Sequence, residues 1–242
     1  MSIKLVSVNI EGQKHLDKIR EFLAREKADV VCMMEVFEDT LDGLSCDYPY
    51  VESAWGYLAD QDREKVIEGR RRWGEVIMSK YPLHNVNKTY LGPYDKNHLA
   101  IHGQDTHAPV LIVADVISPN GTYKIATVHG TWTKGGLVNE RQRSEMGKII
   151  QILSGQEVVL CGDFNIPRGN ELYKIFAENF KDNIPNEVQT TLDPVLHYGN
   201  REEVGRLKFV VDYAWSTKRY KVLEVQIVSG VSDHCALVCT IC

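Results

Sequence analysis

The chain has 242 residues, of which 43% are hydrophobic and 25% are charged, a composition typical of a globular protein with a large buried core. The formal net charge of −5 argues against a strongly basic protein that coats nucleic acid, although it leaves room for a local basic groove. No apolar run approaches the ~20 residues of a membrane span, and no signal-peptide core precedes the first strand pattern. We therefore expect residues 1–242 to form one domain, and we favour a monomer. We also expect a cytoplasmic protein with reduced cysteines that is not inserted in a membrane.

Two predicted strands near the N-terminus each end on a polar side chain. Residues 3–8 are mostly apolar and precede Asn9, and residues 29–34 form a buried strand pattern that stops at Glu35. Between them, residues 15–27 carry leucine and isoleucine at helical spacing, which predicts a surface helix. If the two strands are neighbours, Asn9 and Glu35 should meet at one edge of a sheet.

A basic stretch lies in the first half of the chain. Residues 60–72 alternate acids and bases without apolar periodicity, which indicates an exposed loop. Arg70, Arg71 and Arg72 stand next to Trp73 at its end, and this combination could grip phosphate and stack on a base. The alternative is a solvated loop whose Trp73 covers the core.

Further strands are predicted from apolar runs that lie between turn signals. Pro119, Asn120 and Gly121 form a hairpin turn between two of these strands. His129 follows the second strand of the hairpin and therefore belongs to the same positional series as Glu35. The predicted strands cover residues 50–52, 55–57, 74–79, 110–117, 123–128, 158–161, 209–215, 222–228 and 236–241.

The clearest functional signal is the strand at residues 158–161 and the turn after it. Four consecutive apolar residues leave no face for water, so this strand should be buried on both sides. Gly162 and Pro167 end the regular backbone, which puts Asp163 and Asn165 beyond the strand's carboxyl end, where open sheets present functional groups. A carboxylate there can hold a cation or orient water. On this stretch alone, a turn in which both side chains bond their own backbone explains the pattern equally well.

The segments around this strand complete the predicted organisation. Residues 137–153 are amphipathic and predict a helix before it, and Asn170 can cap a short helix after it. Residues 181–206 are irregular, and residues 190–197 within them are a candidate substrate-lining loop. Asp212 interrupts a buried strand, where a bare carboxylate would be costly, so it needs a partner.

Taken in chain order, these motifs resemble those of the endonuclease/exonuclease/phosphatase superfamily. The resemblance extends from residue 9 to residue 234, and it rests on the order of many motifs, because each motif alone is a weak signal. The motifs are Asn9-Ile10-Glu11-Gly12, Glu35, residues 74–79, His129, Gly162-Asp163-Phe164-Asn165, Asp212-Tyr213 and Ser232-Asp233-His234.

The resemblance implies a DNase I-like fold, which is a four-layer α/β sandwich of two mixed β-sheets packed face to face with helices on the outer faces. It also implies hydrolysis of a phosphate ester with Mg²⁺ or Mn²⁺ at one site across the strand ends. Glu35 is implied as the principal metal ligand, with Asn9, Glu11 and Asp233 supporting the same shell. These oxygen ligands agree with a hard cation and not with zinc.

Catalytic roles follow from the same resemblance. Asp163 is implied to orient or deprotonate the attacking water, and Asn165 to hold water and a phosphate oxygen. Asp212 is implied to fix the tautomer and charge of His234. His234 and His129 are then implied to bond the phosphoryl oxygens and to stabilise the charge that develops there.

Some residues of this chain differ from those of particular subfamilies, and these differences narrow the choice of subfamily. Enzymes similar to exonuclease III carry a tyrosine where this chain has His129, and a tryptophan where it has Leu207 and Phe209. This difference argues against repair of abasic sites. A histidine at this position makes the chain more similar to the deoxyribonuclease, sphingomyelinase, deadenylase and phosphoinositide-phosphatase branches. Glu75 stands where many members have an asparagine.

The leading interpretation is a metal-dependent phosphodiesterase or nuclease that acts on nucleic acid or nucleotides, with Arg70, Arg72 and Trp73 binding the substrate. The second is a phosphatase or phospholipase C-type enzyme on phosphoinositides, sphingomyelin or another small phosphate ester, in which Trp132 near His129 contacts the substrate or a membrane surface. The third is a catalytically dead scaffold that binds a partner through the cleft.

Overall fold

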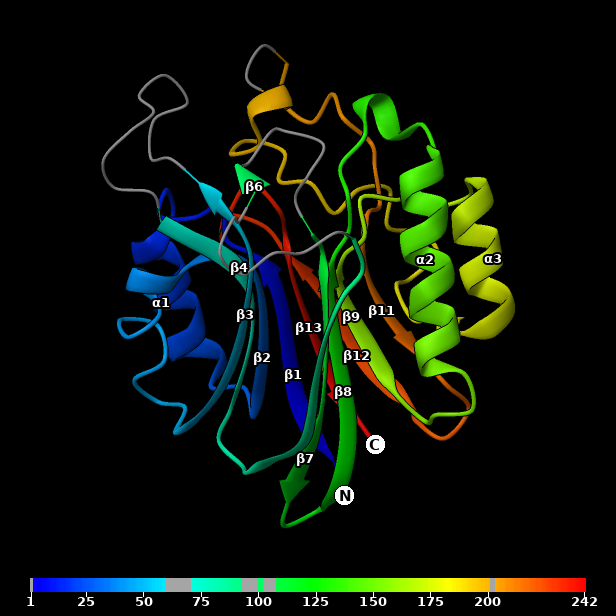
Figure 1. The fold of residues 1–242 in the computed structure, drawn as a ribbon. Coiled ribbons are helices and arrows are strands. Elements are labelled where there is room, and N and C mark those ends of the chain that lie inside the picture. Colours follow the sequence, from blue (N-terminus) through cyan, green and yellow to red (C-terminus); the bar gives the residue numbers. More distant parts are fainter. Residues whose placement is uncertain (1, 60–70, 93–99, 102–107, 201–202) are drawn as a thin grey trace.

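The structure is a computed structural model that describes residues 2–59, 71–92, 100–101, 108–200 and 203–242. Within these residues, two β-sheets pack face to face (Figure 1). The first sheet contains β1 (Ile3–Asn9), β2 (Val30–Phe37), β3 (Tyr50–Ala59), β4 (Arg71–Ser79), β6 (Ala100–Ile101), β12 (Val222–Val228) and β13 (Ala236–Ile241). The second contains β5 (Leu83–Tyr90), β7 (Val110–Ser118), β8 (Gly121–His129), β9 (Val159–Asp163), β10 (Lys181–Asp182) and β11 (Asp212–Ser216).

Both sheets are mixed. The strand order is β12-β13-β1-β2-β4-β3-β6 in the first sheet and β10-β11-β9-β8-β7-β5 in the second. At the centre of the first sheet, β1 pairs parallel with β2 and antiparallel with β13. In the second sheet, β9 pairs parallel with β8 and antiparallel with β11. The two parallel pairs each need a crossover, which α1 supplies between β1 and β2 and α2 supplies between β8 and β9.

Helices cover the outer faces of the two sheets (Figure 1). The helix α1 lies on the first sheet, where Ile19, Phe22 and Leu23 are buried at helical spacing. The helices α2 and α3 lie on the second sheet. The bounds are α1 Leu16–Glu26, α2 Glu140–Leu153 and α3 Glu171–Asn179, and the short 3₁₀ helices are η1 Glu38–Thr40, η2 Lys134–Gly136 and η3 Tyr198–Asn200.

The main core lies between the sheets. Leu5 and Ile77 of the first sheet pack in one buried cluster with Ile112 and Cys161 of the second sheet. Two further buried clusters join each sheet to its covering helices. The layers are therefore helix, sheet, sheet and helix, which confirms the predicted four-layer α/β sandwich.

The register brings several strand ends to one edge of the sandwich. Asn9, the last residue of β1, pairs with Met34 in β2. In the second sheet, Asp163 at the end of β9 pairs with His129 at the end of β8 and with Asp212 at the start of β11. Both chain termini lie at the opposite end (Figure 1). The polar residues singled out in the sequence thus converge on one edge.

Some predicted elements differ in extent. The segments 50–52 and 55–57 are parts of one long strand, β3, and not two short ones, because Gly56 sits at an irregularity that does not end the pairing with β4. The helix predicted at 137–153 begins at Glu140, since Asn139 caps it by accepting a hydrogen bond from the Gln142 amide. The edge strand β5 was not predicted; its residues are largely exposed and polar. No helix in the described part of the chain is long and apolar enough to cross a membrane.

Candidate active site

The turn after β9 holds Asp163 in a fixed orientation. Gly162 has φ 142°, and a Cβ at this position would lie 2.0 Å from the carbonyl oxygen of Val128 on the neighbouring strand. A side chain is therefore excluded there. Asn165 adopts a left-handed conformation, and its backbone amide nitrogen donates to Asp163 Oδ1 at 2.9 Å. Asp163 thus keeps its second carboxylate oxygen, Oδ2, for other partners.

Glu35 reaches the same edge through an irregularity in β2. The pairing of β2 with β4 shifts register between Met33 and Val36, and Glu35 has a φ of 59°. Such a bulge re-aims a side chain without ending the strand. Asn9 of the neighbouring strand β1 then donates from Nδ2 to Glu35 Oε1 at 3.0 Å and to Asp163 Oδ2 at 3.2 Å. This one amide therefore joins an acid of the first sheet to an acid of the second.

His129 lies between the same two acids. Its Nε2 is 3.7 Å from Glu35 Oε1 and 3.6 Å from Asp163 Oδ2. The Nδ2 of Asn165 lies 3.3 Å from His129 Nε2 and donates to the Gly130 carbonyl oxygen at 3.0 Å. The imidazole edge, the amide and the two carboxylates therefore face one small region.

His234 lies between two carboxylates, Asp163 and Asp212. Its Nδ1 is 2.9 Å from Asp212 Oδ2, and its Nε2 is 3.7 Å from Asp163 Oδ2. The buried Asp212 thus has the partner that its position in a strand requires. Because Asp212 holds Nδ1, the Nε2 edge is the one presented to the site.

Glu11 and Asp233 lie beside this cluster. Asp233 accepts a hydrogen bond from the Ser232 hydroxyl at 3.2 Å. Glu11 forms ion pairs with Lys14 and with His15, the latter at 3.1 Å. Burial raises the pKa of Asp233, and the Glu11 charge acts in the same direction.

The electrostatics of the site are those of crowded acids. Burial raises the pKa of Glu35 to about 8, and the Asp233 charge adds to this shift. Burial also raises the pKa values of Asp163 and Asp233. Burial alone would lower the pKa of His234, but the charges of Asp212 and Asp163 raise it well above its usual value. The site therefore gathers several buried acids, and the charge of His234 lowers the pKa values of Asp163 and Asp233 against the effect of burial.

This donor set fits a hard divalent cation. The carboxylates of Glu35 and Asp163 converge from the two sheets on the Asn9 amide nitrogen, while Asn9 Oδ1 accepts from the Glu11 backbone amide. Burial raises the pKa of Glu35, and carboxylate oxygens are ligands that hard cations prefer. Two groups of side chains have ligand atoms within 4.8 Å of one another: Asp163 with Asp212 and His234, and His197 with Asp233 and His234. The first group offers two carboxylates beside His234, and the second offers one carboxylate between two histidines.

The residues predicted to bind the substrate are less clustered. Arg70 lies outside the described residues. Arg72 is exposed and 3.5 Å from Glu38. Trp73 is only 8% exposed and packs on Phe37 with 5.5 Å between ring centroids, which agrees with the alternative in which this ring covers the core. Its place is the core-covering one, because the alternating pattern of β4 turns it inward. Trp132 is 60% exposed and follows His129 by three residues.

Two further residues, to which the sequence patterns assigned no role, also lie close to the site. His197 is 7% exposed and its ring lies edge-on to His234, with 6.1 Å between centroids. Burial lowers the pKa of His197 to about 4, and the His234 charge acts in the same direction. Only the irregular loop before β11 hinted at this residue. Glu75 is buried in β4, and burial raises its pKa well above the usual value.

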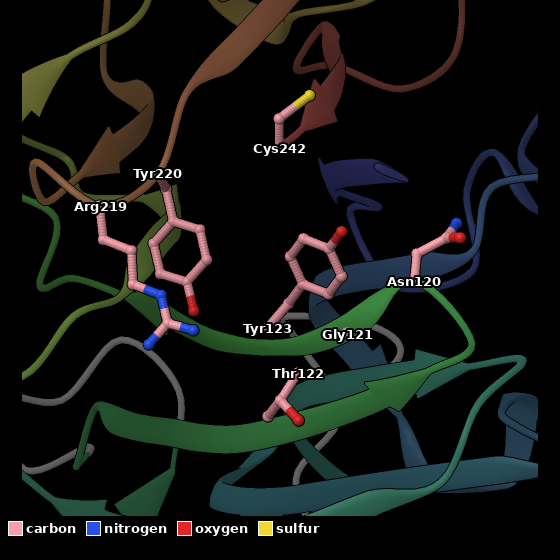
Figure 2. A pocket seen from close by; sticks show the side chains of 7 residues that line it. All are labelled: Asn120, Gly121, Thr122, Tyr123, Arg219, Tyr220 and Cys242. Atoms are coloured by element: carbon pink, nitrogen blue, oxygen red, sulfur yellow. The ribbon is translucent and has the colours of Figure 1, made fainter. Parts of the chain in front are cut away.

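A separate pocket lies at the other end of the sandwich. It has a volume of about 250 Å³ and is bounded by the hairpin between β7 and β8 and by the turn before β12 (Figure 2). Its Tyr123 and Tyr220 rings are stacked, with 6.3 Å between centroids. Since β8 begins in this pocket and ends at His129, the pocket is remote from the acid cluster.

Comparison with known proteins agrees with this geometry. The class of protein is that of the hydrolases of phosphate esters, as the family match shows. The sequence matches the model of the Endonuclease/Exonuclease/phosphatase family over residues 6–234, and the chain therefore belongs to that family. No curated protein matches the sequence.

Several solved structures share the fold. An endonuclease/exonuclease/phosphatase from Beutenbergia cavernae has a TM-score of 0.75 and 18% identity, and the match covers 99% of this chain and 71% of that one. The human Nocturnin catalytic domain has a TM-score of 0.68 and 18% identity, with coverage of 100% and 94%. Sphingomyelinase C from Streptomyces griseocarneus has a TM-score of 0.67 and 15% identity, with 99% of each chain covered. At these identities the likeness concerns the fold alone.

Proposed function

We propose that the protein is a Mg²⁺- or Mn²⁺-dependent phosphodiesterase that acts on nucleic acid or nucleotides. The observation that carries this proposal is the convergence on Asp163 Oδ2 of Asn9 at 3.2 Å, His129 at 3.6 Å and His234 at 3.7 Å. A carboxylate ringed by donors can orient a water molecule, and the donors around it can bind the oxygens of the group that the water attacks.

The charge problem of this reaction explains the residue types. A phosphodiester is an anion and resists an anionic nucleophile. Glu35 would be the principal ligand of the metal ion, and Asn9, Glu11 and Asp233 would support the same shell. When bound, the ion would supply charge neutralisation at the phosphate oxygens.

The remaining residues handle the water and the developing charge. Asp163, held by the Asn165 amide, would present the water. The protonated His234 and the nearby His129 would donate to the phosphoryl oxygens, and Asp212 would keep His234 charged. The side chain of Asn165 would hold a water or a phosphate oxygen close to His129.

Exposed aromatic rings near the strand ends support a substrate with bases. Trp132 is 60% exposed and Tyr198, which follows His197, is 54% exposed. Stacking on aromatic rings tolerates any base, since every base has a π face. Arg72 would contact the phosphate backbone only after leaving Glu38, and with Trp73 buried the basic stretch contributes less to this proposal than the two exposed rings do.

The test is hydrolysis by the purified protein with Mg²⁺ or Mn²⁺ across a panel of substrates: single- and double-stranded DNA, abasic DNA, polyadenylated RNA, sphingomyelin and phosphoinositides. We expect cleavage of a nucleic acid that Asp163→Asn loses and that the matched control Asp17→Asn, on the exposed face of α1, retains. Turnover confined to a lipid or a small ester would contradict the nucleic-acid proposal.

A second candidate is an enzyme that acts on a phospholipid or another small phosphate ester. The exposure of Trp132 favours it, because an indole ring can enter the interface of a membrane. Binding to sphingomyelin vesicles that Trp132→Ala abolishes would support this candidate. Equal sedimentation of the variant and the wild-type protein with vesicles would count against it.

A further inference from the structure

We propose that His197 is a further catalytic residue, which donates a hydrogen bond from Nε2 to the oxygen of the leaving group. This inference rests on the proposed hydrolysis of a phosphate ester and adds a residue to it. The starting observation is that His197, although far from the strand ends in sequence, packs edge-on against His234 with 6.1 Å between ring centroids.

The loop that carries His197 is built into the site by buried polar contacts. Asp193 Oδ1 accepts from the backbone amides of Val195 at 2.9 Å and Leu196 at 2.7 Å, and its Oδ2 accepts from the Gly230 amide at 2.6 Å. The Asp193 amide in turn donates to the Asp233 carbonyl oxygen at 2.8 Å. The loop is therefore tied to the turn that carries Asp233 and His234, so the position of His197 relative to His234 is fixed.

A hydrogen bond sets the tautomer of His197. The Gly199 amide donates to Nδ1 at 3.1 Å, so Nδ1 is an acceptor and the ring proton lies on Nε2. The ring of Tyr198 stacks on the imidazole with 4.7 Å between centroids, which restrains its plane. In the described part of the chain, no residue accepts a hydrogen bond from Nε2. His197 therefore presents a pre-oriented donor that has no acceptor among the residues that the structure describes.

The same tautomer argues against a role as a metal ligand. A ligand atom of His197 lies within 4.8 Å of ligand atoms of Asp233 and His234. A histidine ligand needs a free lone pair on the nitrogen that faces the metal, and it normally donates through its other nitrogen. His197 has the reverse arrangement, since Nδ1 already accepts and Nε2 carries the proton. Donation to a substrate oxygen needs no change of tautomer.

The position of His197 favours the leaving-group side. Asp163 shares one group of close side chains with His234, and His197 shares a different group with His234. The attacking and leaving oxygens lie roughly in line on opposite sides of phosphorus. Asp163 and His197 thus belong to different groups of close side chains, so with Asp163 presenting the water we assign the other reacting oxygen, that of the leaving group, to His197.

The step balances without further reagents. Water forms the new P–O bond, and its proton passes to the Asp163 carboxylate. The P–O bond to the leaving group breaks, and its electron pair moves onto the leaving oxygen. His197 Nε2–H stabilises this charge by hydrogen bonding and keeps its proton, because loss of it would leave an imidazolate. The oxygen takes its proton from bulk water.

Aryl esters of thymidine 5′-phosphate with p-nitrophenyl, p-chlorophenyl and phenyl leaving groups test this role in the presence of Mn²⁺. Leaving oxygens of higher basicity need more stabilisation. We therefore expect His197→Phe to lower kcat/KM on the order of 10²-fold for the phenyl ester and much less for the p-nitrophenyl ester. His197→Gln, whose amide can donate near the position of Nε2, should recover most of the loss. His197→Asn, which reaches only to Nδ1, should not.

The controls separate the possible failures. His84→Phe, on the exposed edge strand β5, should match the wild type on every ester. Equal losses of His197→Phe on all three esters, or no loss, would overturn the leaving-group role. Loss of one Mn²⁺ site by calorimetry in His197→Phe would overturn it in favour of a metal ligand. If the folded wild-type protein cleaved no ester, the proposed function itself would fail, and the role of His197 with it.

Discussion

At the scale of single residues, His234 and Asp212 form the unit on which the charge of the site depends. The contact of 2.9 Å between His234 Nδ1 and Asp212 Oδ2 is buried, and the Asp212 charge is the largest contribution that raises the pKa of His234. Burial acts in the opposite direction. Without this carboxylate, the pKa of the imidazole would be lower, and the ring would stabilise a developing negative charge less well.

Asp212→Asn tests this dependence. The substitution keeps the shape of the side chain but removes its charge, so the pKa of His234 should fall and kcat should decrease on the order of 10²- to 10⁴-fold. The alkaline limb of the pH profile of kcat should move to lower pH, because His234 would lose its proton earlier. NMR titration of the His234 ring in both proteins checks the cause. An unchanged His234 pKa in the variant would contradict the assignment.

The individual site residues differ in how well the sequence predicts them. Asp163, Glu35 and His129 each follow an apolar strand, and their positions alone suggested that they would meet. His197 had no such signal, because its place depends on contacts of an irregular loop with the turn before β13. For Trp73 the sequence left two alternatives open, because its basic neighbours suggested a surface position while a tryptophan often covers a core. Its burial against Phe37 agrees with the second alternative.

At the scale of elements, the N-terminal turn of α2 links the ends of two strands. Gln142 is buried, and its Nε2 donates to the carbonyl oxygens of Thr131 at 2.7 Å and Asn165 at 3.2 Å. The Thr131 hydroxyl donates to Glu145 Oε1 at 2.9 Å, and Arg141 Nε reaches the same oxygen at 2.7 Å. The helix thereby fixes the segments that follow His129 in β8 and Asp163 in β9.

Gln142→Leu should weaken catalysis by loosening these two segments. The variant leaves two buried carbonyl oxygens without their donor, which costs about 1–3 kcal/mol of stability. We expect a Tm lower by several degrees and a kcat lower by roughly tenfold, since misplacement by about 1 Å can cost 10²-fold. Calorimetry and turnover on one ester measure both effects. Gln151→Leu, on the exposed side of the same helix, should change neither. Wild-type kcat in Gln142→Leu would show that the link is not needed for catalysis.

Most elements were predictable because their burial leaves a clear periodicity. The apolar runs of β1, β2, β9 and β13 and the helical spacing in α1 identify elements that bury one or both faces. The strand β5 was missed because an exposed edge strand carries no such pattern. The bulge that turns Glu35 into the site was not predictable either, since it depends on the pairing of β2 with β4.

At the scale of the whole molecule, the acid cluster joins the two sheets and sets the response to pH. The folded protein keeps a proton on Glu35 up to a pKa of about 8, whereas the unfolded chain loses it near the usual value of 4.5. Stability of the metal-free protein should therefore fall as pH rises through this interval. His234, whose pKa is also raised, contributes in the same direction, because its stabilisation is lost as it deprotonates.

Thermal unfolding of the metal-free protein at pH 6.5 and 8.5 measures this effect. The shift of Glu35 across the interval corresponds to about 2 kcal/mol, or a Tm lower by roughly 4–8 °C at pH 8.5. Saturating Mg²⁺ should raise the Tm more at pH 8.5 than at pH 6.5, because a cation competes with the proton on Glu35. In Glu35→Gln both differences should shrink. A Tm that rises with pH in the absence of metal would contradict this electrostatic picture.

The most direct test of metal-dependent hydrolysis at this site is the turnover of bis(p-nitrophenyl) phosphate by the wild-type protein and by Glu35→Ala. Each protein is assayed with Mg²⁺ or Mn²⁺ and with EDTA. Hydrolysis of this ester reports the chemical reaction and does not depend on recognition of a particular biological substrate. We expect metal-dependent turnover by the wild type that EDTA abolishes. Glu35→Ala should show no turnover although circular dichroism shows that it is folded. Equal turnover by the two proteins, or turnover indifferent to EDTA, would contradict the assignment of the site.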